Sequence, residues 1–563
     1  MKKIVKVKTK NKLKNAKKEK RAFTLLELLA VIGILAIILI IAVPKINNVL
    51  DQVKERAFLS SARIIVEAID SERARVIGFD VSTINAGNID TIVDVDKTNY
   101  STIVATVVSN STNVNIVGAG KYNGITVAGT KETLAVVPPV TETTGTLLAM
   151  SNFGGSAIDA YYGISTVVGG YVAVGESRSA DYNLVGMNQG DYDALIVKYD
   201  NNNNVLWSDT FGGLYYDCYK NAVEVSDGIV AVGVSKSTNG DLLGSGSVAT
   251  TDYSDALIVK YDLAGAVLWR KVLRGTYSES FQDIAPADDS GVVVVGDTSS
   301  NDYDVPNFNY GVNGQSNATI VKYDSSGNVV WKKYFGGNNG SNRFTDIVKV
   351  SDGYIVAGYG AATTLDMVGL RYDASTTVGD PILVKFDFSG NVVWKKHFGG
   401  TKSDNFNSVD VVSDGLIVTG EASSTDYDLV GMNKGSSDAI IVKYDFTGNV
   451  LWKKNIGGAN GDSFLDAVGV SDGYLAVGFS WSSTLDFAGL NKGSSDAIMV
   501  KYDFAGTMVW KKNYGGLNLD QHLGIAKVGS SYIVAGMAYS NDSDYAGKHY
   551  GLTTVGDATI SVY

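Results

Sequence analysis

An eight-residue segment that returns at regular spacing constrains this chain more than any other feature. DALIVKYD occupies residues 193–200 and returns unchanged at 255–262. Related segments follow at 317–324, 380–387, 438–445, 496–503 and, in shortened form, 557–563. These seven copies begin 58 to 63 residues apart. A period of this size is typical of architectures in which each repeat is one supersecondary unit.

Each repeat predicts four β-strands. In the fifth repeat they are FNSVDVVSDG, LIVTGEA, DAIIVKYD and NVLWKKNIGG, within residues 406–458. Asp414 and Gly415 predict a tight hairpin between the first two strands. Gly448 ends the turn before the fourth strand, where a positive φ is expected. The first repeat has Asn203 at that position, and Asn tolerates this conformation.

The middle strands are apolar on both faces, as in YIVAG at 354–358, so both faces must be covered. Seven four-stranded units packed face to face in a ring satisfy this requirement. We therefore predict a seven-bladed β-propeller over residues 147–563. The last repeat ends after its third strand, whereas an unassigned strand precedes the first repeat. We expect residues 145–153 to close the ring beside 557–563.

A tryptophan recurs in the fourth strand of six repeats. These residues are Trp207, Trp269, Trp331, Trp394, Trp452 and Trp510. The unit resembles propeller repeats of the quinoprotein-like kind, in which such a Trp docks one blade on the next. The resemblance implies a blade-docking role for the six residues, and no quinone cofactor follows from it.

The N-terminus is different in character. Residues 1–22 hold 11 Lys or Arg and one acidic residue, Glu19. The remaining residues hold 37 Lys or Arg and 58 Asp or Glu, which gives them a net charge of −21. Residues 23–43 are apolar except for Glu27. A helix of that length spans roughly 30 Å, the thickness of the hydrocarbon layer. The basic flank predicts a cytoplasmic leader, and the acidic remainder argues against nucleic-acid binding.

The segment RAFTLLE at 21–27 resembles the processing site of type IV prepilins. The resemblance implies that prepilin peptidase cuts between Ala22 and Phe23, that Phe23 is then methylated, and that Glu27 guides assembly with other pilin subunits. Pro44 stands where the family commonly has a helix-kinking proline. Where the family usually has Gly before the cut, this chain has Ala22. A carboxylate in lipid usually has a partner, and the new α-amino group of a neighbouring subunit is a suitable cation.

The segments that follow predict a pilin-like unit. A helix is expected over 23–78, transmembrane at 23–43 and amphipathic beyond Pro44. The predicted apolar stripe is Ile46, Val49, Leu50, Val53, Ala57, Ile64 and Ala68. Residues 79–136 predict a small β head, and residues 137–146, with Pro138 and Pro139, predict a semi-rigid linker.

Few residues suggest site chemistry. The Asp-rich loop before the third strand of the fifth repeat offers Asp426, Asp428 and Asp438 as calcium ligands, with turn capping as the alternative. The single cysteine, Cys218, excludes an internal disulfide. The three histidines, His397, His522 and His549, lie in different repeats, and no catalytic set recurs. The sequence thus predicts a binding protein without a cofactor and not an enzyme, although abundant carboxylates keep a glycosidase open.

These features together predict a type IV pilus subunit that displays a β-propeller for adhesion. It would begin in the cytoplasmic membrane and end in an extracellular filament on the cell surface. Its expected partners are the pilus assembly machinery and an unidentified surface ligand, a glycan or a host or matrix protein. The alternatives are a membrane-tethered enzyme acting on a glycan or polymer, and a pseudopilin of a secretion or DNA-uptake system.

Overall fold

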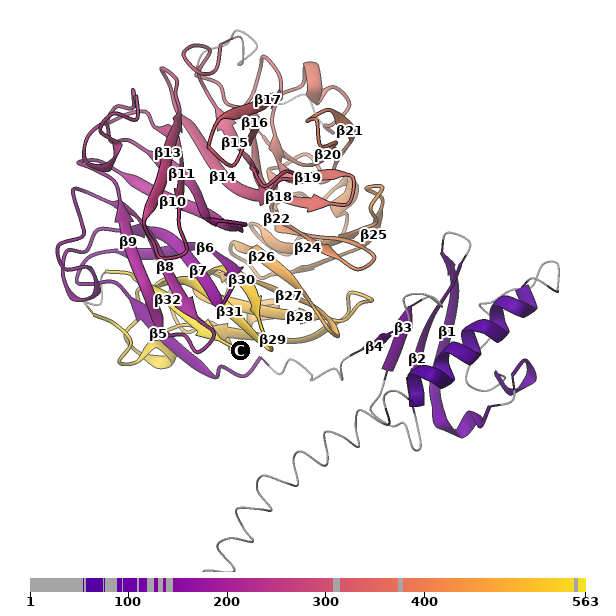
Figure 1. The fold of residues 1–563 in the computed structure, drawn as a ribbon. Coiled ribbons are helices and arrows are strands. Elements are labelled where there is room, and N and C mark those ends of the chain that lie inside the picture. Colours follow the sequence, from indigo (N-terminus) through magenta and orange to yellow (C-terminus); the bar gives the residue numbers. More distant parts are fainter. Residues whose placement is uncertain are drawn as a thin grey trace, which may run out of the picture. The chain divides into compact units, whose positions relative to one another are not determined.

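A computed structural model describes residues 54, 57–73, 75, 89–93, 95–108, 111–118, 126–129, 135–137, 145–306, 314–372, 378–550 and 555–563. The chain divides into two compact units, Met1–Thr141 and Glu142–Tyr563. The division falls inside the segment predicted as a linker. Each unit has its own hydrophobic core, and Figure 1 shows the elements of both.

The first unit places a helix against a small antiparallel sheet. The helix covers 57–73, and the sheet runs in the order β1 (Tyr100–Val108), β2 (Ser111–Gly118), β3 (Thr126–Gly129) and β4 (Ala135–Val137). Short 3-10 turns at Ile89–Thr91 (η2) and Lys97–Asn99 (η3) precede β1. The Arg73 guanidinium donates to Asp70 at 3.1 Å and to Thr112 at 2.9 Å, which ties the helix to β2.

The apolar stripe of this helix differs from the predicted one. The buried residues are Phe58, Ala62, Ile65, Val66 and Ile69, which pack on Ile103, Val114, Ile116 and Val127 of the sheet. Ile64, assigned to the stripe from the sequence, is 50% exposed. Ile64, Ile65 and Val66 are consecutive, and successive helical residues turn by about 100°. One residue of the three must therefore face outward, and the sheet selects Ile65 and Val66.

The second unit is a seven-bladed propeller of four-stranded antiparallel sheets, as predicted. Figure 1 shows the blades around a common centre. Blade 1 contains β6 (Asp159–Val167), β7 (Gly170–Ser177), β8 (Asp193–Asp200) and β9 (Val205–Phe211). Blade 2 contains β10 (Asp217–Val225), β11 (Gly228–Ser235), β12 (Asp255–Tyr261) and β13 (Val267–Leu273). Blade 3 contains β14 (Glu279–Pro286), β15 (Val292–Thr298), β16 (Asn317–Tyr323) and β17 (Val329–Phe335).

The remaining blades repeat this order. Blade 4 contains β18 (Asn342–Val350), β19 (Gly353–Gly360), β20 (Asp380–Phe386) and β21 (Val392–His397). Blade 5 contains β22 (Asp404–Val412), β23 (Gly415–Ala422), β24 (Asp438–Tyr444) and β25 (Val450–Ile456). Blade 6 contains β26 (Asp462–Val470), β27 (Gly473–Ser480), β28 (Asp496–Tyr502) and β29 (Met508–Tyr514). Blade 7 contains β30 (Asp520–Val528), β31 (Ser531–Ala538), β32 (Asp557–Val562) and β5 (Ala149–Phe153).

Burial and turn geometry follow from the repeat. Every residue of β7 and β11 is buried, because a neighbouring blade covers each face. In the turn before the fourth strand, Gly448 has a φ of 79° and Asn203 a φ of 65°. A Cβ on Gly415 would collide with the carbonyl oxygen of Tyr444, so the hairpin of blade 5 requires glycine there.

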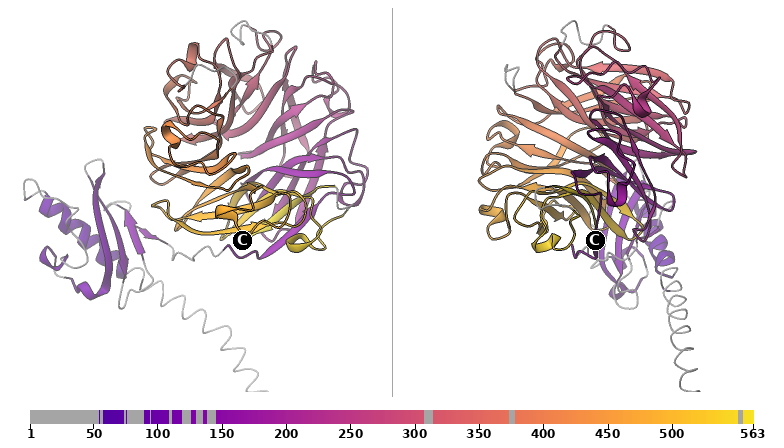
Figure 2. Two further views of the ribbon diagram at one scale, coloured as in Figure 1. Left: turned by 180° about the vertical axis from the view of Figure 1, so that it is seen from behind. Right: turned by 90° about the vertical axis from the view of Figure 1, so that its left-hand side faces the viewer.

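The seventh blade combines strands from opposite ends of the propeller unit. β5 pairs antiparallel with β32, with Phe153 opposite Ala558 and Ala149 opposite Val562. In Figure 2 the purple strands at the start of the propeller unit lie next to the yellow strands at its C-terminal end. β5 belongs to the sheet of the C-terminal strands although it precedes blade 1 in the chain. Residues 149–153 thus stand where the other blades have their fourth strand.

The predicted long helix lies mostly outside the described residues. Residues 1–53, with the leader and the apolar segment, are not among them. Within the described part of the chain, no helix has the length and apolar character needed to cross a membrane.

Candidate functional site: the central channel

The propeller encloses a cavity of about 300 Å³ lined by the first strand of every blade. Each of these strands has an irregularity in its register at the cavity, where one extra residue is inserted. The inserted residues are Tyr162, Lys220, Gln282, Thr345, Asn407, Leu465 and Leu523. Such bulges redirect side chains. The chain thereby presents six kinds of side chain at seven equivalent positions of otherwise similar blades, with leucine at two of them.

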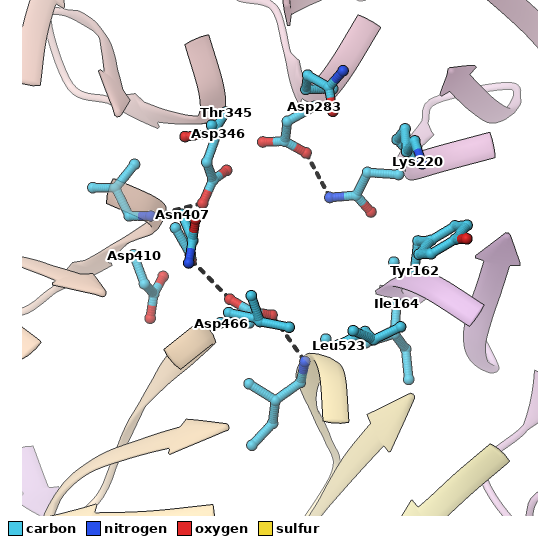
Figure 3. Close-up of a pocket in the computed structure, with 18 of the residues that line it drawn as sticks. Tyr162, Ile164, Lys220, Asp283, Thr345, Asp346, Asn407, Asp410, Asp466 and Leu523 are labelled. Carbon is cyan, nitrogen blue, oxygen red and sulfur yellow. Dashed lines mark hydrogen bonds between the residues drawn. The ribbon is translucent and has the colours of Figure 1, made fainter. Parts of the chain in front are cut away.

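Four carboxylates surround this cavity (Figure 3): Asp283, Asp346, Asp410 and Asp466. Lys220 and Tyr162 lie across the cavity from Asp410, and the Lys220 ammonium lies 4.0 Å from the centre of the Tyr162 ring. The cavity is therefore acidic on one side and carries a cation and an aromatic ring on the other.

The carboxylates connect successive blades. Asp283 accepts a hydrogen bond from the backbone N–H of Ile347 at 2.8 Å, and Asp346 accepts one from Val409 at 2.7 Å. Asp410 likewise accepts from Gly469 at 3.0 Å, and Asp466 from Ile525 at 2.8 Å. In every case the donor belongs to the next blade, so these four residues link the inner strands of five blades.

Burial changes the acidity of this group. It raises the pKa of Asp466 to about 7 and that of Asp410 to about 6. The pKa of Asp283 is also raised well above its usual value, first by burial and then by the neighbouring Asp346 carboxylate. Protons are consequently held in the channel at mildly acidic pH, and the site suits neutral or cationic ligands better than anions.

The sequence did not predict this group of carboxylates. Asp283, Asp346 and Asp466 each follow a buried Phe by two residues in the first strand of a blade. Strict alternation would place the Asp on the same face as the Phe. The register irregularity between them changes that direction, and only the strand pairing reveals it.

The three calcium candidates make separate contacts. Asp426 accepts hydrogen bonds from the backbone N–H and the hydroxyl of Thr401, at 2.9 and 2.7 Å. Asp428 accepts from the Tyr372 hydroxyl at 2.7 Å, and Asp438 accepts from Asn455 at 2.5 Å. Among the described residues, no group of three or more His, Cys, Asp or Glu has the arrangement of a metal site.

The recurring tryptophans contact the neighbouring blade. The indole N–H groups of Trp207, Trp269 and Trp452 donate to the backbone carbonyls of Leu263, Ser325 and Phe504, at 3.1, 3.1 and 3.2 Å. The other three tryptophans lie close to a glycine, where an added Cβ atom would collide with or crowd the indole ring. The pairs are Trp331 with Gly390, Trp394 with Gly448, and Trp510 with Gly145. Each Trp thus packs against the turn of another blade or, for Trp510, against the segment that precedes β5.

The other predicted residues are separate from the channel. His522 is fully buried, which lowers its pKa to about 4, and burial also lowers the pKa of His397. His549 lies 3.8 Å from Asp557. Ala22, Phe23, Glu27 and Pro44 lie outside the described residues.

Comparison with known proteins gives two kinds of similarity. Residues 17–43 match the family described as the prokaryotic N-terminal methylation motif. Two curated proteins are similar to the chain. An uncharacterized WD repeat-containing protein of Acanthamoeba polyphaga mimivirus is 22% identical over 60% of this chain and 30% of its own length. The regulatory protein FlaEY of Caulobacter vibrioides is 25% identical over 38% of this chain and 23% of its own length. The chain thus spans under a third of the length of each relative.

Solved structures that resemble this chain include the WD40 domain of Neurospora crassa Pan2 and Drosophila Plexin A in complex with Semaphorin 1b. The Pan2 domain has 8% identity and a TM-score of 0.37, and the match covers 74% of this chain and 94% of the Pan2 chain. Plexin A has 6% identity and a TM-score of 0.40, covering 74% and 86%. The seven-bladed assignment rests on the strand pairing of this chain itself. Residues 17–43 carry a prepilin-type methylation motif, and the C-terminal unit is a β-propeller.

Proposed function

We propose that this chain is a type IV pilin-like subunit that assembles through its N-terminal helix and displays its propeller on a cell-surface filament. The observation that carries the proposal is the order of three parts. A prepilin-type methylation motif at 17–43 precedes a helix packed on a small sheet, and a complete propeller follows. The first part supplies processing and assembly, and the last supplies a large rigid domain for display.

The role proposed for the propeller is binding without catalysis. The carboxylates of its channel accept hydrogen bonds from the backbone of the next blade, which gives them a structural role. The seven inserted side chains of the channel are of six kinds, five of them polar, and offer a ligand one asymmetric surface. A surface glycan or a matrix protein segment is the proposed class of ligand.

Mass spectrometry of sheared surface filaments tests the first half of this proposal. We expect a mature N-terminus at methylated Phe23. We also expect Glu27→Ala to be cut normally but to give few filaments, because the buried α-amino group loses its partner. Glu19→Ala is the matched control, since Glu19 leaves with the leader. Filaments that retain the leader, or a normal filament yield from Glu27→Ala, would refute the pilin assignment.

Exposure of the whole filament to glycan and matrix-protein arrays tests the second half. Saturable binding that leaves the ligand chemically intact supports adhesion. Release of shortened glycan supports the membrane-tethered enzyme instead. Recovery of the chain only in a secretion complex supports the pseudopilin alternative.

A further inference from the structure

Pairs of buried acidic residues recur where one blade meets the next. The first residue of the third strand of one blade lies beside the first residue of the first strand of the following blade. The backbone brings them together: the N–H of Asp217 donates to Tyr192, the residue before Asp193, at 2.8 Å, and the same bond recurs at all seven junctions. We call each junction a blade joint. The joints are Asp193–Asp217, Asp255–Glu279, Asn317–Asn342, Asp380–Asp404, Asp438–Asp462, Asp496–Asp520 and Asp557–Asp159, and all their residues are 0% exposed.

The joint between blades 1 and 2 shows the difficulty that such a pair creates. Asp217 receives hydrogen bonds from the hydroxyls of Ser235 and Ser237 and from the backbone N–H of Gly213. Asp193 receives one from the N–H of Gln189 at 2.6 Å, through Oδ2. Its Oδ1 has no hydrogen-bond partner, and a Cβ on Gly212 would collide with this oxygen and with Oδ2 of Asp217. Two carboxylate oxygens thus face the same glycine with no donor assigned between them.

The joint between blades 3 and 4 shows how a donor resolves this arrangement. Asn317 and Asn342 occupy the two positions, and Nδ2 of Asn342 donates to Oδ1 of Asn317 at 3.1 Å. The two serines of blade 2 are replaced here by Gly360 and Ala362, so the hydroxyl donors disappear together with the carboxylate. The amide supplies a hydrogen between the two residues that a carboxylate pair lacks.

The groups around these joints favour a proton over a metal ion. Two hydroxyls and one backbone N–H donate hydrogen bonds to Asp217, and among the described residues no group of three or more His, Cys, Asp or Glu has the arrangement of a metal site. In two joints, the third acidic residue nearby already has its own partner. Asp241 accepts from the Gln189 side chain at 2.6 Å, and Asp544 pairs with Lys492 at 2.5 Å.

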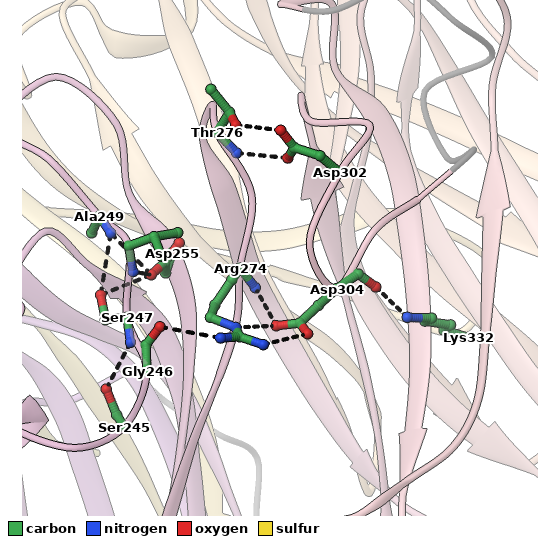
Figure 4. A network of polar contacts seen from close by, with 11 residues as sticks. Ser245, Gly246, Ser247, Ala249, Asp255, Arg274, Thr276, Asp302, Asp304 and Lys332 are labelled. Atoms are coloured by element: carbon green, nitrogen blue, oxygen red, sulfur yellow. Dashed lines mark hydrogen bonds and ion pairs between the residues drawn. The ribbon is translucent and has the colours of Figure 1, made fainter.

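Figure 4 shows the corresponding region beside Asp255. Asp304 pairs there with the Arg274 guanidinium at 2.7 Å. Asp255 accepts through Oδ2 from the Ser247 hydroxyl at 2.7 Å and from two backbone N–H groups, while its Oδ1 has no hydrogen-bond partner. Asp193 and Asp255, which occupy equivalent positions in two joints, thus each have one carboxylate oxygen without a hydrogen-bond partner.

We propose that the two carboxyl groups of an acidic joint, as in Asp193–Asp217 and Asp255–Glu279, share one proton, so that the propeller binds protons between its blades. One carboxyl keeps the proton and donates it to an oxygen of the other, which reproduces the amide hydrogen bond of the Asn317–Asn342 joint. Six of the seven joints are acidic, and in two of them a basic side chain is also close: Arg371 Nε lies 3.9 Å from Asp380, and His549 Nδ1 lies 3.8 Å from Asp557.

The direction of the pH effect follows from linkage. Burial, together with the Asp217 and Asp241 carboxylates, raises the pKa of Asp193 from 3.8 to about 7. Burial likewise raises the pKa of Asp217, Asp159 and Asp520 to about 6. A group whose pKa is higher in the folded protein binds more protons when folded, so stability falls as pH rises. Burial also raises the pKa of Glu279 to about 8. The joints are fully stabilising below about pH 4, and this stabilisation is lost as pH rises through about 6 to 8.

The test is a thermal melt of the full-length chain in a neutral detergent at several pH values, with tryptophan fluorescence as the signal of unfolding. All seven tryptophans lie beyond residue 206, so the signal reports on the propeller. We expect a Tm lower at about pH 8 than at about pH 5 by roughly 5 °C or more. Asp193→Asn should flatten this dependence and exceed the wild-type Tm at the higher pH, because its amide supplies the missing hydrogen. Asn317→Asp, which creates a new acidic joint, should steepen it.

A second measurement does not depend on the variants folding. Infrared difference spectra of the native chain should contain the carbonyl stretch of protonated carboxyl groups at about pH 5, and this band should weaken as the pH rises to about 8. Its absence at the lower pH, or a Tm that does not change with pH, would overturn the proposal. A Tm at the higher pH that rises with Ca²⁺ and falls with chelator would also overturn it, in favour of a bound cation.

Discussion

At the residue scale, the recurring tryptophans show how one side chain joins two blades. Trp452 extends from β25 in blade 5, and its indole N–H donates to the Phe504 carbonyl in the turn of blade 6. Gly506 in that turn lies so close that a Cβ would collide with the indole. Tyr474 of blade 6 packs beside the same ring, with centroids 5.8 Å apart. The glycine and the tryptophan are therefore complementary halves of one contact.

Truncating this side chain should weaken the propeller. We expect Trp452→Ala to lower the free energy of unfolding by about 3 kcal/mol, because it removes packing and a hydrogen bond. Trp481→Ala is the matched control: Trp481 lies in a loop, is 39% exposed, and should cost under about 1 kcal/mol. Urea unfolding followed by circular dichroism compares the two. Equal losses would show that the docking contact adds nothing specific.

At the element scale, blades 2 to 6 each pair a lysine of the third strand with an aspartate in the hairpin between the first two strands. Lys443 of β24 is almost fully buried, and its ammonium lies 2.6 Å from Asp414 in the hairpin between β22 and β23. The same pairing occurs for Lys260 with Asp227 and for Lys501 with Asp472. Blade 7 has Ser561 at the lysine position and no Asp in its hairpin. Blade 1 keeps the lysine, Lys198, without an Asp in its hairpin, and its ammonium donates instead to the Leu263 carbonyl at 3.5 Å.

This pairing predicts that a double replacement is milder than a single one. Asp414→Ala leaves the buried ammonium of Lys443 without its carboxylate and should cost about 1–2 kcal/mol, since the Asp side chain itself is largely exposed. Lys443→Ser combined with Asp414→Ser, which copies blade 7, should cost less than Asp414→Ala alone. A double-mutant cycle on the free energy of unfolding measures the difference. Strict additivity of the single changes would contradict the pairing.

At the scale of the whole molecule, blade 7 joins the two ends of the propeller. Residues from β5, β6, β7 and β8 share one hydrophobic core with residues of β30, β31 and β32. β32 lies between β31 and β5 within its sheet. Loss of β32 would therefore detach β5 and expose the facing surface of blade 1.

Deletion of 557–563 should consequently destabilise the entire ring and not only its last strand. We expect a Tm lower by roughly 10 °C or more, with loss of cooperativity in the fluorescence melt. Deletion of residues 1–22 is the control and should leave the melt of the propeller unchanged. A wild-type Tm after removal of 557–563 would contradict a closure role for this sheet.

The sequence by itself determined the number of blades, the strands in each blade and the conformation of the turns. These depend on local patterns: the period of the repeat, the apolar middle strands, and the glycine or Asn203 at positions of positive φ. The orphan strand before the first repeat also indicated its partner, because the last repeat ends one strand short. The prepilin-type segment could likewise be recognised from the sequence, since its motif is contiguous.

Only the tertiary structure decided which residues meet between blades. The strand irregularities that direct Asp283, Asp346 and Asp466 to the channel have no local sequence signal. The partners in a joint, such as Asp193 and Asp217, become neighbours only when two blades pack. The same holds for the helix of the first unit, where the sheet selected Ile65 and Val66 over Ile64. Local propensity specifies an element, whereas the surface against which it packs specifies its orientation.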